Sequence, residues 1–311
     1  MPLRLLAAVV AALIVPGAAS ASQLIDRDAS QLHLLVARNG TALLQYNAHG
    51  IKRQVAVWGA INARHPDPNA AQVKFKLDYS GRTWRKAKLK NACRPYDGPE
   101  LAWFVTGCTA SDGSYWAVQS WQRALPDLGF TPWLTTQTVW ELHISHWTGP
   151  VAELTLGTDW VYHGRWEELF GQLTYRGVPV HGFKTTSRGV TLDGYGRNLY
   201  LDTFDSVYGP GWRRENGFVT HNPNGNFCYG FYPFKTAAYS HPLGSLPTRG
   251  PGVGTRYRIS VIGPGVTPDV AAGIDGLHPF DAKNPADVAW EAEQDSVRSE
   301  LAASDTLCKH T

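Results

Sequence analysis

Hydrophobic and polar residues alternate along most of the chain between residues 31 and 232, in short segments separated by turn-forming residues. In residues 73–79, for example, every second residue is hydrophobic and the three between them are charged. Successive side chains of a β-strand point to opposite faces of its sheet, so this alternation indicates strands with one buried face. The pattern predicts a mainly β protein with an antiparallel β-sandwich or jelly-roll-like fold.

Two turn signals predict how the first strands connect. Asn39-Gly40 is the dipeptide most typical of a tight β-hairpin, and His49-Gly50 supplies a second turn nearby. Both turns lie between hydrophobic segments. The sequence therefore predicts a three-stranded meander over residues 32–36, 43–46 and 55–61.

The C-terminal part of the chain lacks this regular alternation. Residues 240–283 are rich in Gly and Pro and are expected to form loops, with one strand over 255–262 and a short helix near 268–272. A C-terminal α-helix is predicted over 285–303, because Asn284 is a favourable cap and is followed by proline. Three hydrophobic residues on one face of this helix are expected to pack on the sheet: Trp290, Val297 and Leu301.

The first 21 residues have the features of a signal peptide. Arg4 precedes an apolar stretch over residues 5–15, and small residues lead to a cleavage site between Ala21 and Ser22. No later apolar run is long enough to cross a bilayer. We therefore expect a secreted or extracytoplasmic protein in which residues 22–311 form a single β-rich domain, with two packed sandwiches as the alternative.

The four cysteines support an oxidising compartment. An even number of cysteines in an exported chain predicts disulfides, and three connectivities are possible for four. The simplest has one short and one long loop, and it pairs Cys93 with Cys108 and Cys228 with Cys308. The sequence contains no C-x-x-C pair, the spacing that would indicate a metal site instead.

Charge and motifs exclude several classes of function. A net charge of only +3 argues against the broad basic footprint that nucleic-acid binding requires, so no nucleic-acid partner is expected. The sequence contains no H-E-x-x-H, G-x-S-x-G or G-x-x-x-x-G-K-[ST] motif. His143 and His146 form an H-x-x-H, yet on a strand they point to opposite faces. We expect no metal and no cofactor, and this absence favours a non-enzymatic protein.

A second hairpin is predicted over residues 138–147 and 151–163, with Trp147 opposite Val151. This register would gather polar side chains on one face: Glu141, His143, Ser145, Glu153, Thr155 and Asp159. They could line the cleft of a glycosidase- or esterase-like secreted hydrolase, in which the catalytic candidates are Glu141, His143, Glu153 and Asp159. The pattern favours the other interpretation, the solvated face of an amphipathic sheet.

Aromatic residues supply the leading functional hypothesis. The chain has 12 Trp, 13 Tyr and 11 Phe, and some of them lie beside turn residues rather than at alternating strand positions. Exposed rings with polar neighbours suit an aromatic-rich groove for a glycan or similar polar ligand. The candidate ligand-binding residues are Trp147, Trp166, Asp193, Tyr195, Arg197, Asn198, Tyr208, Trp212 and Arg213. If these rings instead fill the core, a purely structural extracellular role is favoured.

A basic run adds a possible partner. Residues 82–94 contain six Lys or Arg and no Asp or Glu. Such a run could bind an anionic envelope polymer. The spacing of Lys86, Lys88 and Lys90 favours a solvated edge strand, because lysines on an edge prevent unwanted pairing.

Four segments in the first half of the chain carry a resemblance: residues 57–62 (VWGAIN), 90–96 (KNACRPY), 112–116 (DGSYW) and 119–123 (QSWQR). They resemble an exported protein family of actinobacterial type that has no assigned activity. The resemblance covers roughly residues 30 to 235. It implies an exported, disulfide-bonded protein, and it implies no activity, cofactor or catalytic residue.

Overall fold

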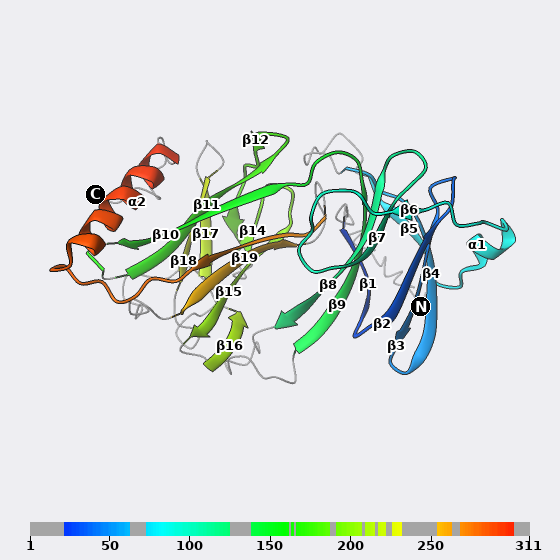
Figure 1. Ribbon diagram of the computed structural model, residues 1–311, viewed down its shortest axis with the longest axis horizontal. Helices are drawn as coiled ribbons and strands as arrows, with labels where there is room; N and C mark the ends of the chain where they lie inside the picture. Colours follow the sequence, from blue (N-terminus) through cyan, green and yellow to red (C-terminus); the bar gives the residue numbers. More distant parts are fainter. Residues whose placement is uncertain are drawn as a thin grey trace, which may run out of the picture.

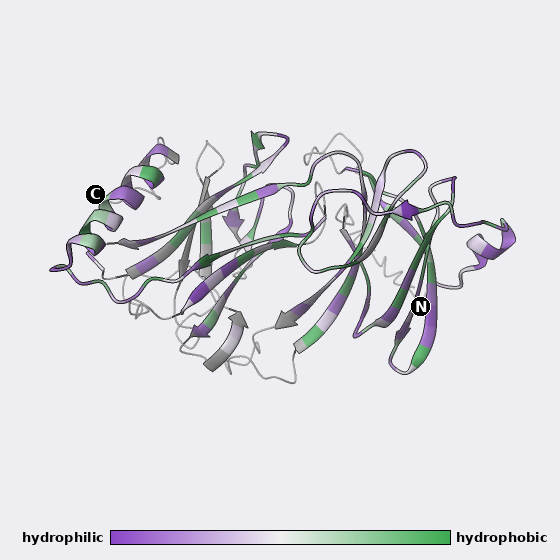
Figure 2. Cartoon of the chain, viewed as in Figure 1, coloured by the Kyte–Doolittle hydropathy of each residue, from purple (hydrophilic) through white to green (hydrophobic). Residues whose placement is uncertain are grey.

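The structure is a computed structural model, and its strands form four antiparallel sheets (Figure 1). It describes residues 22–62, 73–124, 138–161, 163–164, 166–186, 191–206, 209–214, 217–221, 226–231, 254–262 and 268–301. Hydrophobic and hydrophilic residues alternate along these strands (Figure 2). The mainly β, antiparallel fold with a C-terminal helix is thus confirmed.

Two sheets pack in the N-terminal half, which we define as residues 22–147. One sheet is the meander in the order β2-β3-β4-β5: Ser30–Val36, Ala42–Ala48, Ile51–Gly59 and Phe75–Asp78. The other has the order β1-β9-β8-β7-β6: Ser22–Arg27, Thr138–Trp147, Tyr115–Ala124, Phe104–Thr109 and Arg94–Pro95. Leu44, Trp116 and Leu142 belong to the buried cluster that joins them. The predicted meander and both of its turns are confirmed.

Two further sheets pack in the C-terminal half, which we define as residues 153–301. The first contains β10 (Glu153–Val161), β11 (Trp166–Tyr175), β18 (Asn226–Phe231) and β17 (Gly217–His221), with β12 (Val178–Pro179) beside β11. The second contains β13 (Lys184–Thr185), β14 (Thr191–Leu192), β15 (Asn198–Ser206), β19 (Arg256–Ile262) and β20 (Val270–Asp275), with β16 (Gly209–Arg214) beside β15. A second buried cluster, including Leu169, Leu201 and Ile259, lies between these sheets.

The predicted hairpin over residues 138–163 is wrong, although its strands exist. β9 pairs with β1 and β8, whereas β10 pairs with β11, so the two strands lie in different sheets. Asn62 explains why the chain does not turn back after Trp147. Its amide donates to the Thr148 carbonyl and accepts from the Thr148 N–H, both at 2.8 Å, and so occupies backbone groups that a tight turn would use.

The basic run does not form an edge strand, which corrects a second prediction. Arg82–Lys86 is a short helix, α1, and residues 87–88 form a turn after it. Asp78 favours the helix because its carboxylate accepts hydrogen bonds from the backbone N–H and hydroxyl of Thr83, both at 2.8 Å. The helix predicted near 268–272 is also wrong, because β20 begins there and Val270 pairs with Val261 of β19.

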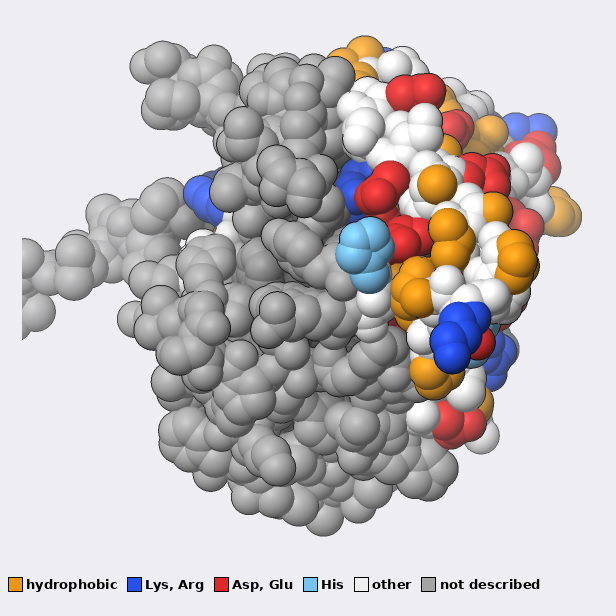
Figure 3. Space-filling view, turned by 90° about the vertical axis from the view of Figure 1, so that its left-hand side faces the viewer, with side chains coloured by type: hydrophobic (Ala, Val, Ile, Leu, Met, Phe, Trp, Pro, Cys, Tyr) orange, Lys and Arg blue, Asp and Glu red, His pale blue; other side chains and the backbone are white. Residues whose placement is uncertain are grey.

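The C-terminal helix α2 (Pro285–Leu301) is confirmed, but its packing is not as predicted. Trp290 and Val297 are each 40 % exposed, and the buried residues are Asp287, Glu291 and Arg298. The reason is electrostatic: β10 presents the buried carboxylate of Asp159, which lies 2.8 Å from Arg298 Nη1. Figure 3 shows hydrophobic side chains among acidic ones at the end of the molecule that carries α2. None of the helices described is long and apolar enough to cross a membrane.

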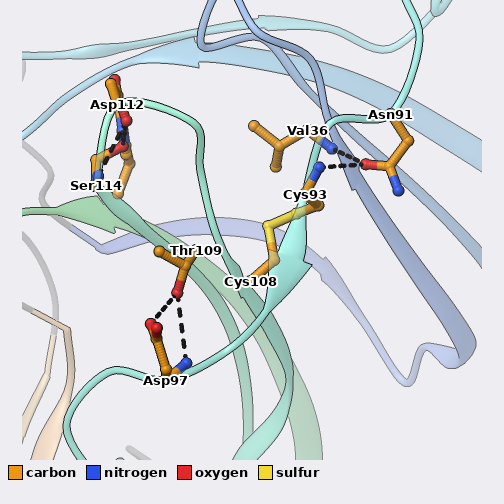
Figure 4. The surroundings of a disulfide bond; sticks show 9 residues. Val36, Asn91, Cys93, Asp97, Cys108, Thr109, Asp112 and Ser114 are labelled. Carbon is orange, nitrogen blue, oxygen red and sulfur yellow. Dashed lines mark hydrogen bonds between the residues drawn. A yellow bond between two sulfur atoms is a disulfide. The ribbon is translucent and has the colours of Figure 1, made fainter.

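The disulfide between Cys93 and Cys108 is confirmed, with the two Cα atoms 5.6 Å apart (Figure 4). It links the residue before the short strand β6 to the neighbouring strand β7. Cys228 lies on β18, while its predicted partner Cys308 falls outside the described residues. Residues 1–21 of the predicted signal peptide also fall outside, and β1 begins at Ser22.

Candidate functional site

The polar face of β9 is buried between the two halves of the molecule. Glu141, His143 and Ser145 share one face as the alternation predicts, yet they are only 4 %, 5 % and 1 % exposed. Their opposite face carries Leu142 and Ile144, which belong to the N-terminal core. The interpretation of this polar face as solvated is therefore wrong, because the C-terminal half covers it.

His143 is the centre of this buried polar cluster. Its Nδ1 lies 3.0 Å from Ser22 Oγ of β1 and 3.5 Å from Asp269 Oδ2, while its Nε2 lies 3.3 Å from Glu141 Oε2. Glu141 also contacts Arg27, whose Nη2 lies 3.3 Å from Oε1. The imidazole thus has a carboxylate near each nitrogen and a hydroxyl beside Nδ1, an arrangement suited to moving or holding a proton.

Gln119 and Trp121 of β8 hold Asp269 in this position. The Gln119 amide donates to the Asp269 carbonyl at 2.9 Å and accepts from its N–H at 3.1 Å. The indole N–H of Trp121 donates to Asp269 Oδ2 at 3.2 Å, and the Trp121 ring lies 5.2 Å from the ring of His143. Because Asp269 precedes β20, these contacts join the two halves. Sequence reasoning missed Asp269, which stands in a Gly/Pro-rich segment without a motif.

The other predicted acids are not part of this cluster. Glu153 is exposed on β10, and Asp159 is buried against Arg298 of α2. Their separation from Glu141 follows from the different sheets of β9 and β10. The four-residue catalytic constellation predicted from the hairpin therefore does not form.

A second group of side chains lies on the outer face of the sheet that contains β15. The register places Trp212, Phe204, Arg256 and Asp275 in one row, and Asp202, Arg258 and Gly273 in the next. Residues between them, such as Tyr257, point into the core. We call these seven residues the Trp212 face.

Two arginines stack on the aromatic rings of this face. Arg258 Cζ lies 4.5 Å from the Trp212 ring and 5.6 Å from the ring of Trp103, which comes from the N-terminal half. Arg256 Cζ lies 4.3 Å from the Phe204 ring. Arg258 Nη2 donates to Asp202 at 2.8 Å. Such cation–π contacts fix the guanidinium groups, so their outward N–H groups are held ready for a polar partner.

Two residues beside this face have unfavourable backbone conformations. Trp103 has a φ of 53°, in the left-handed region that bulky side chains rarely adopt. Asp205 has a φ of 50° at a bulge between β15 and β16, where the register shifts beside Phe204. Bulges and strained residues of this kind occur often where a side chain must be aimed at a functional site.

The Trp212 face contains an open hollow of about 370 Å³. Its lining includes four residues of this face, Trp212, Arg256, Gly273 and Asp275, and two residues adjacent to them in the strands. Gly273 lies opposite Arg258 in the register and has no side chain, so this part of the row is open. A Cβ at Gly273 would meet only the Tyr257 carbonyl, at 3.5 Å, so a larger side chain would fit the backbone there.

Comparison with protein-family models, curated proteins and solved structures finds no match. Within the described ranges, no group of three or more His, Cys, Asp or Glu side chains is placed to hold a metal ion. The chemistry of the two clusters therefore carries the functional argument.

Three of the other predicted ligand-binding residues are structural. Trp147 is fully buried beside Tyr96 and Tyr115, so it cannot face a ligand. Asp193 and Arg197 are buried and form an ion pair, with Asp193 Oδ2 2.7 Å from Arg197 Nε. This pair closes the turn between β14 and β15, which explains the burial of both side chains.

The remaining candidates divide between partly buried and undescribed positions. Tyr195 and Asn198 are partly buried near that turn, and Trp212 is partly buried on the face named after it. Tyr208 falls outside the described residues, as do the side chains of Trp166 and Arg213. Of the predicted set, only Trp212 is seen in the arrangement expected of a ligand-binding aromatic residue.

Proposed function

We propose that this protein is an exported binding protein that holds a glycan or a similar polar ligand on the Trp212 face. The observation that carries the proposal is the stacking of Arg258 between the indoles of Trp103 and Trp212, beside an open hollow. The proposed export has its basis in the predicted signal peptide, and the Cys93–Cys108 disulfide is compatible with it.

The chemistry of the face suits a sugar. The apolar C–H groups of a sugar ring can pack on Phe204 and Trp212, which bury apolar area without needing a charged partner. Sugar hydroxyls can donate to Asp275 and accept from Arg256, both exposed at the rim of the hollow.

Tryptophan fluorescence titration with a panel of cell-wall and plant oligosaccharides tests this proposal. A saturable change is expected, weakened about tenfold or more by Trp212→Ala, because one stacking platform is removed. Gly273→Leu should also weaken binding, because its side chain would occupy the hollow while its Cβ fits the backbone. Trp290→Ala on α2 is the matched control and should bind normally. Absence of saturable binding across the panel, or normal binding by Gly273→Leu, would refute the proposal.

One observation favours a second candidate function, hydrolysis of an ester or glycosidic bond. Ser22 Oγ lies 3.0 Å from His143 Nδ1, and Glu141 lies beside Nε2. His143 could then accept the hydroxyl proton of Ser22 while Glu141 orients the ring, as in other serine hydrolases. A fluorophosphonate probe tests this: Ser22 should be labelled with loss of fluoride, and Ser22→Ala should abolish the labelling. An unlabelled wild-type protein would remove this candidate.

A further inference from the structure

Helix α1 lies at the end of the molecule opposite α2 (Figure 1). The residues that follow α1 line a basic groove. The groove is a hollow of about 620 Å³. Its polar lining consists of Arg38, Asn39, Lys88, Lys90, Asn91 and Ser111, and the lining contains no Asp or Glu. We call it the Lys88 groove. It belongs to the N-terminal half and shares no lining residue with the Trp212 face.

Lys88 enters the groove from a conformation that lysine disfavours. It follows the C-cap of α1 with a φ of 48°. Its N–H donates to the Arg85 carbonyl at 3.1 Å, and the N–H of Leu89 donates to the Trp84 carbonyl at 3.2 Å. These two bonds define a Schellman motif, in which this position is usually glycine. Leu89 packs with Trp84, as the motif requires. Lysine thus occupies a position where glycine would have the lower conformational energy.

The wall of the groove beyond Lys90 is fixed by hydrogen bonds and a disulfide (Figure 4). Asn91 Oδ1 accepts from the N–H groups of Val36 and Cys93, at 3.0 and 3.1 Å. The Ala92 N–H donates to the Val36 carbonyl at 2.7 Å, and Cys93 is bonded to Cys108. The cations therefore project from a fixed backbone, which lowers the entropy lost when an extended ligand binds.

Two acidic residues close in sequence to the lining form local hydrogen bonds. Asp112 follows Ser111 in the chain, but its carboxylate accepts from the N–H and hydroxyl of Ser114. Asp78 accepts from Thr83 at the start of α1. The groove has a positive potential because its lining holds three cations and no acid, and the run 82–94 adds further basic residues.

We propose that the Lys88 groove binds a linear polyanion whose repeating units carry phosphate or carboxylate groups. A groove with three cations and no acid in its lining matches a chain of regularly spaced anions. A lysine at a glycine-like position has a use if its ammonium group contacts that polymer, because strained residues are often found at functional sites.

Fluorescence anisotropy at low ionic strength tests this proposal with labelled polygalacturonate and polyphosphate, and with neutral dextran as the uncharged reference. Binding of at least one polyanion is expected, and its dependence on salt should be steep. Lys88→Gln and Lys90→Gln should each weaken binding about fivefold. Lys88→Gly should weaken it similarly while leaving the fold intact. Lys52→Gln is the matched control, because Lys52 lines a separate hollow in the same half.

The outcomes separate a groove from general charge attraction. Loss of binding confined to the Lys88 and Lys90 variants supports the proposal, whichever polymer binds more tightly. Two outcomes overturn it: wild-type affinity for both polyanions equal to that for dextran, or equal weakening by Lys52→Gln. None of these outcomes bears on ligand binding at the Trp212 face.

Discussion

Replacing Lys88 by glycine should stabilise this protein, although it removes a charged side chain from a folded turn. Lys88 has a φ of 48° and its side chain is exposed, so little packing is lost. The left-handed conformation costs an L-residue about 1 to 2 kcal/mol, and glycine does not pay this cost. Glycine loses about 0.5 to 1 kcal/mol more backbone entropy on folding. The expected net gain is therefore about 0.5 to 1 kcal/mol.

Urea denaturation, followed by intrinsic fluorescence, measures this gain in the free energy of unfolding. A thermal midpoint about 2 °C higher should accompany it if the N-terminal half unfolds cooperatively. Lys86→Gly is the matched control, because it makes the same chemical change at the last residue of α1. It should destabilise the protein by about 0.5 to 1 kcal/mol, since glycine weakens a helix. Destabilisation by Lys88→Gly as well would refute the reasoning from backbone strain.

Three further predictions follow from buried contacts. Burial lowers the pKa of His146 below its ordinary value of 6.5, so the unfolded chain binds the proton more readily. The contribution of His146 to the free energy of unfolding should therefore be full above pH 6.5 and fall as the pH drops below it. Denaturation curves measured across pH should show a smaller loss of stability at low pH in His146→Gln. Replacing Cys93 and Cys108 by serine should cost about 3 kcal/mol of unfolding free energy, measured in urea; a cost near zero would contradict the loop-entropy argument. Asp159→Asn should cost about 3 kcal/mol, because the buried charge of Arg298 would lose its buried carboxylate and keep only the half-exposed Asp295, and an unchanged urea midpoint would count against this ion pair.

Local patterns predicted strands and turns well because they depend on neighbouring residues. The alternation in β9 places Glu141 and His143 on one face, and Asn39-Gly40 marks the first turn of the meander. Neither pattern contains information about what covers a face. The burial of His143 depends on Asp269, which lies more than a hundred residues away and has no sequence signal that links it to β9.

The wrong predictions for the hairpin and for the packing of α2 have a common physical cause. In both places a long-range polar contact determines the structure instead of the local alternation of hydrophobic and polar residues. The amide of Asn62 holds the backbone of Thr148 and prevents the predicted hairpin. The buried carboxylate of Asp159 draws Arg298 inward and leaves Trp290 exposed on α2. Each contact joins residues that the alternation of hydrophobic and polar positions treats as independent. The predicted ligand set failed at Trp147 for a related reason, because a Trp beside a turn can still pack in a core.

The stack of Trp103, Arg258 and Trp212 also has a thermodynamic consequence. Trp103 belongs to the N-terminal half, whereas Arg258 and Trp212 belong to the C-terminal half. A ligand that binds this stack contacts both halves, so it raises the equilibrium constant for docking of the two halves. By linkage, docking raises the affinity for that ligand by the same factor. The unfolding temperature of the N-terminal half would then report occupancy of a surface that lies mostly on the other half.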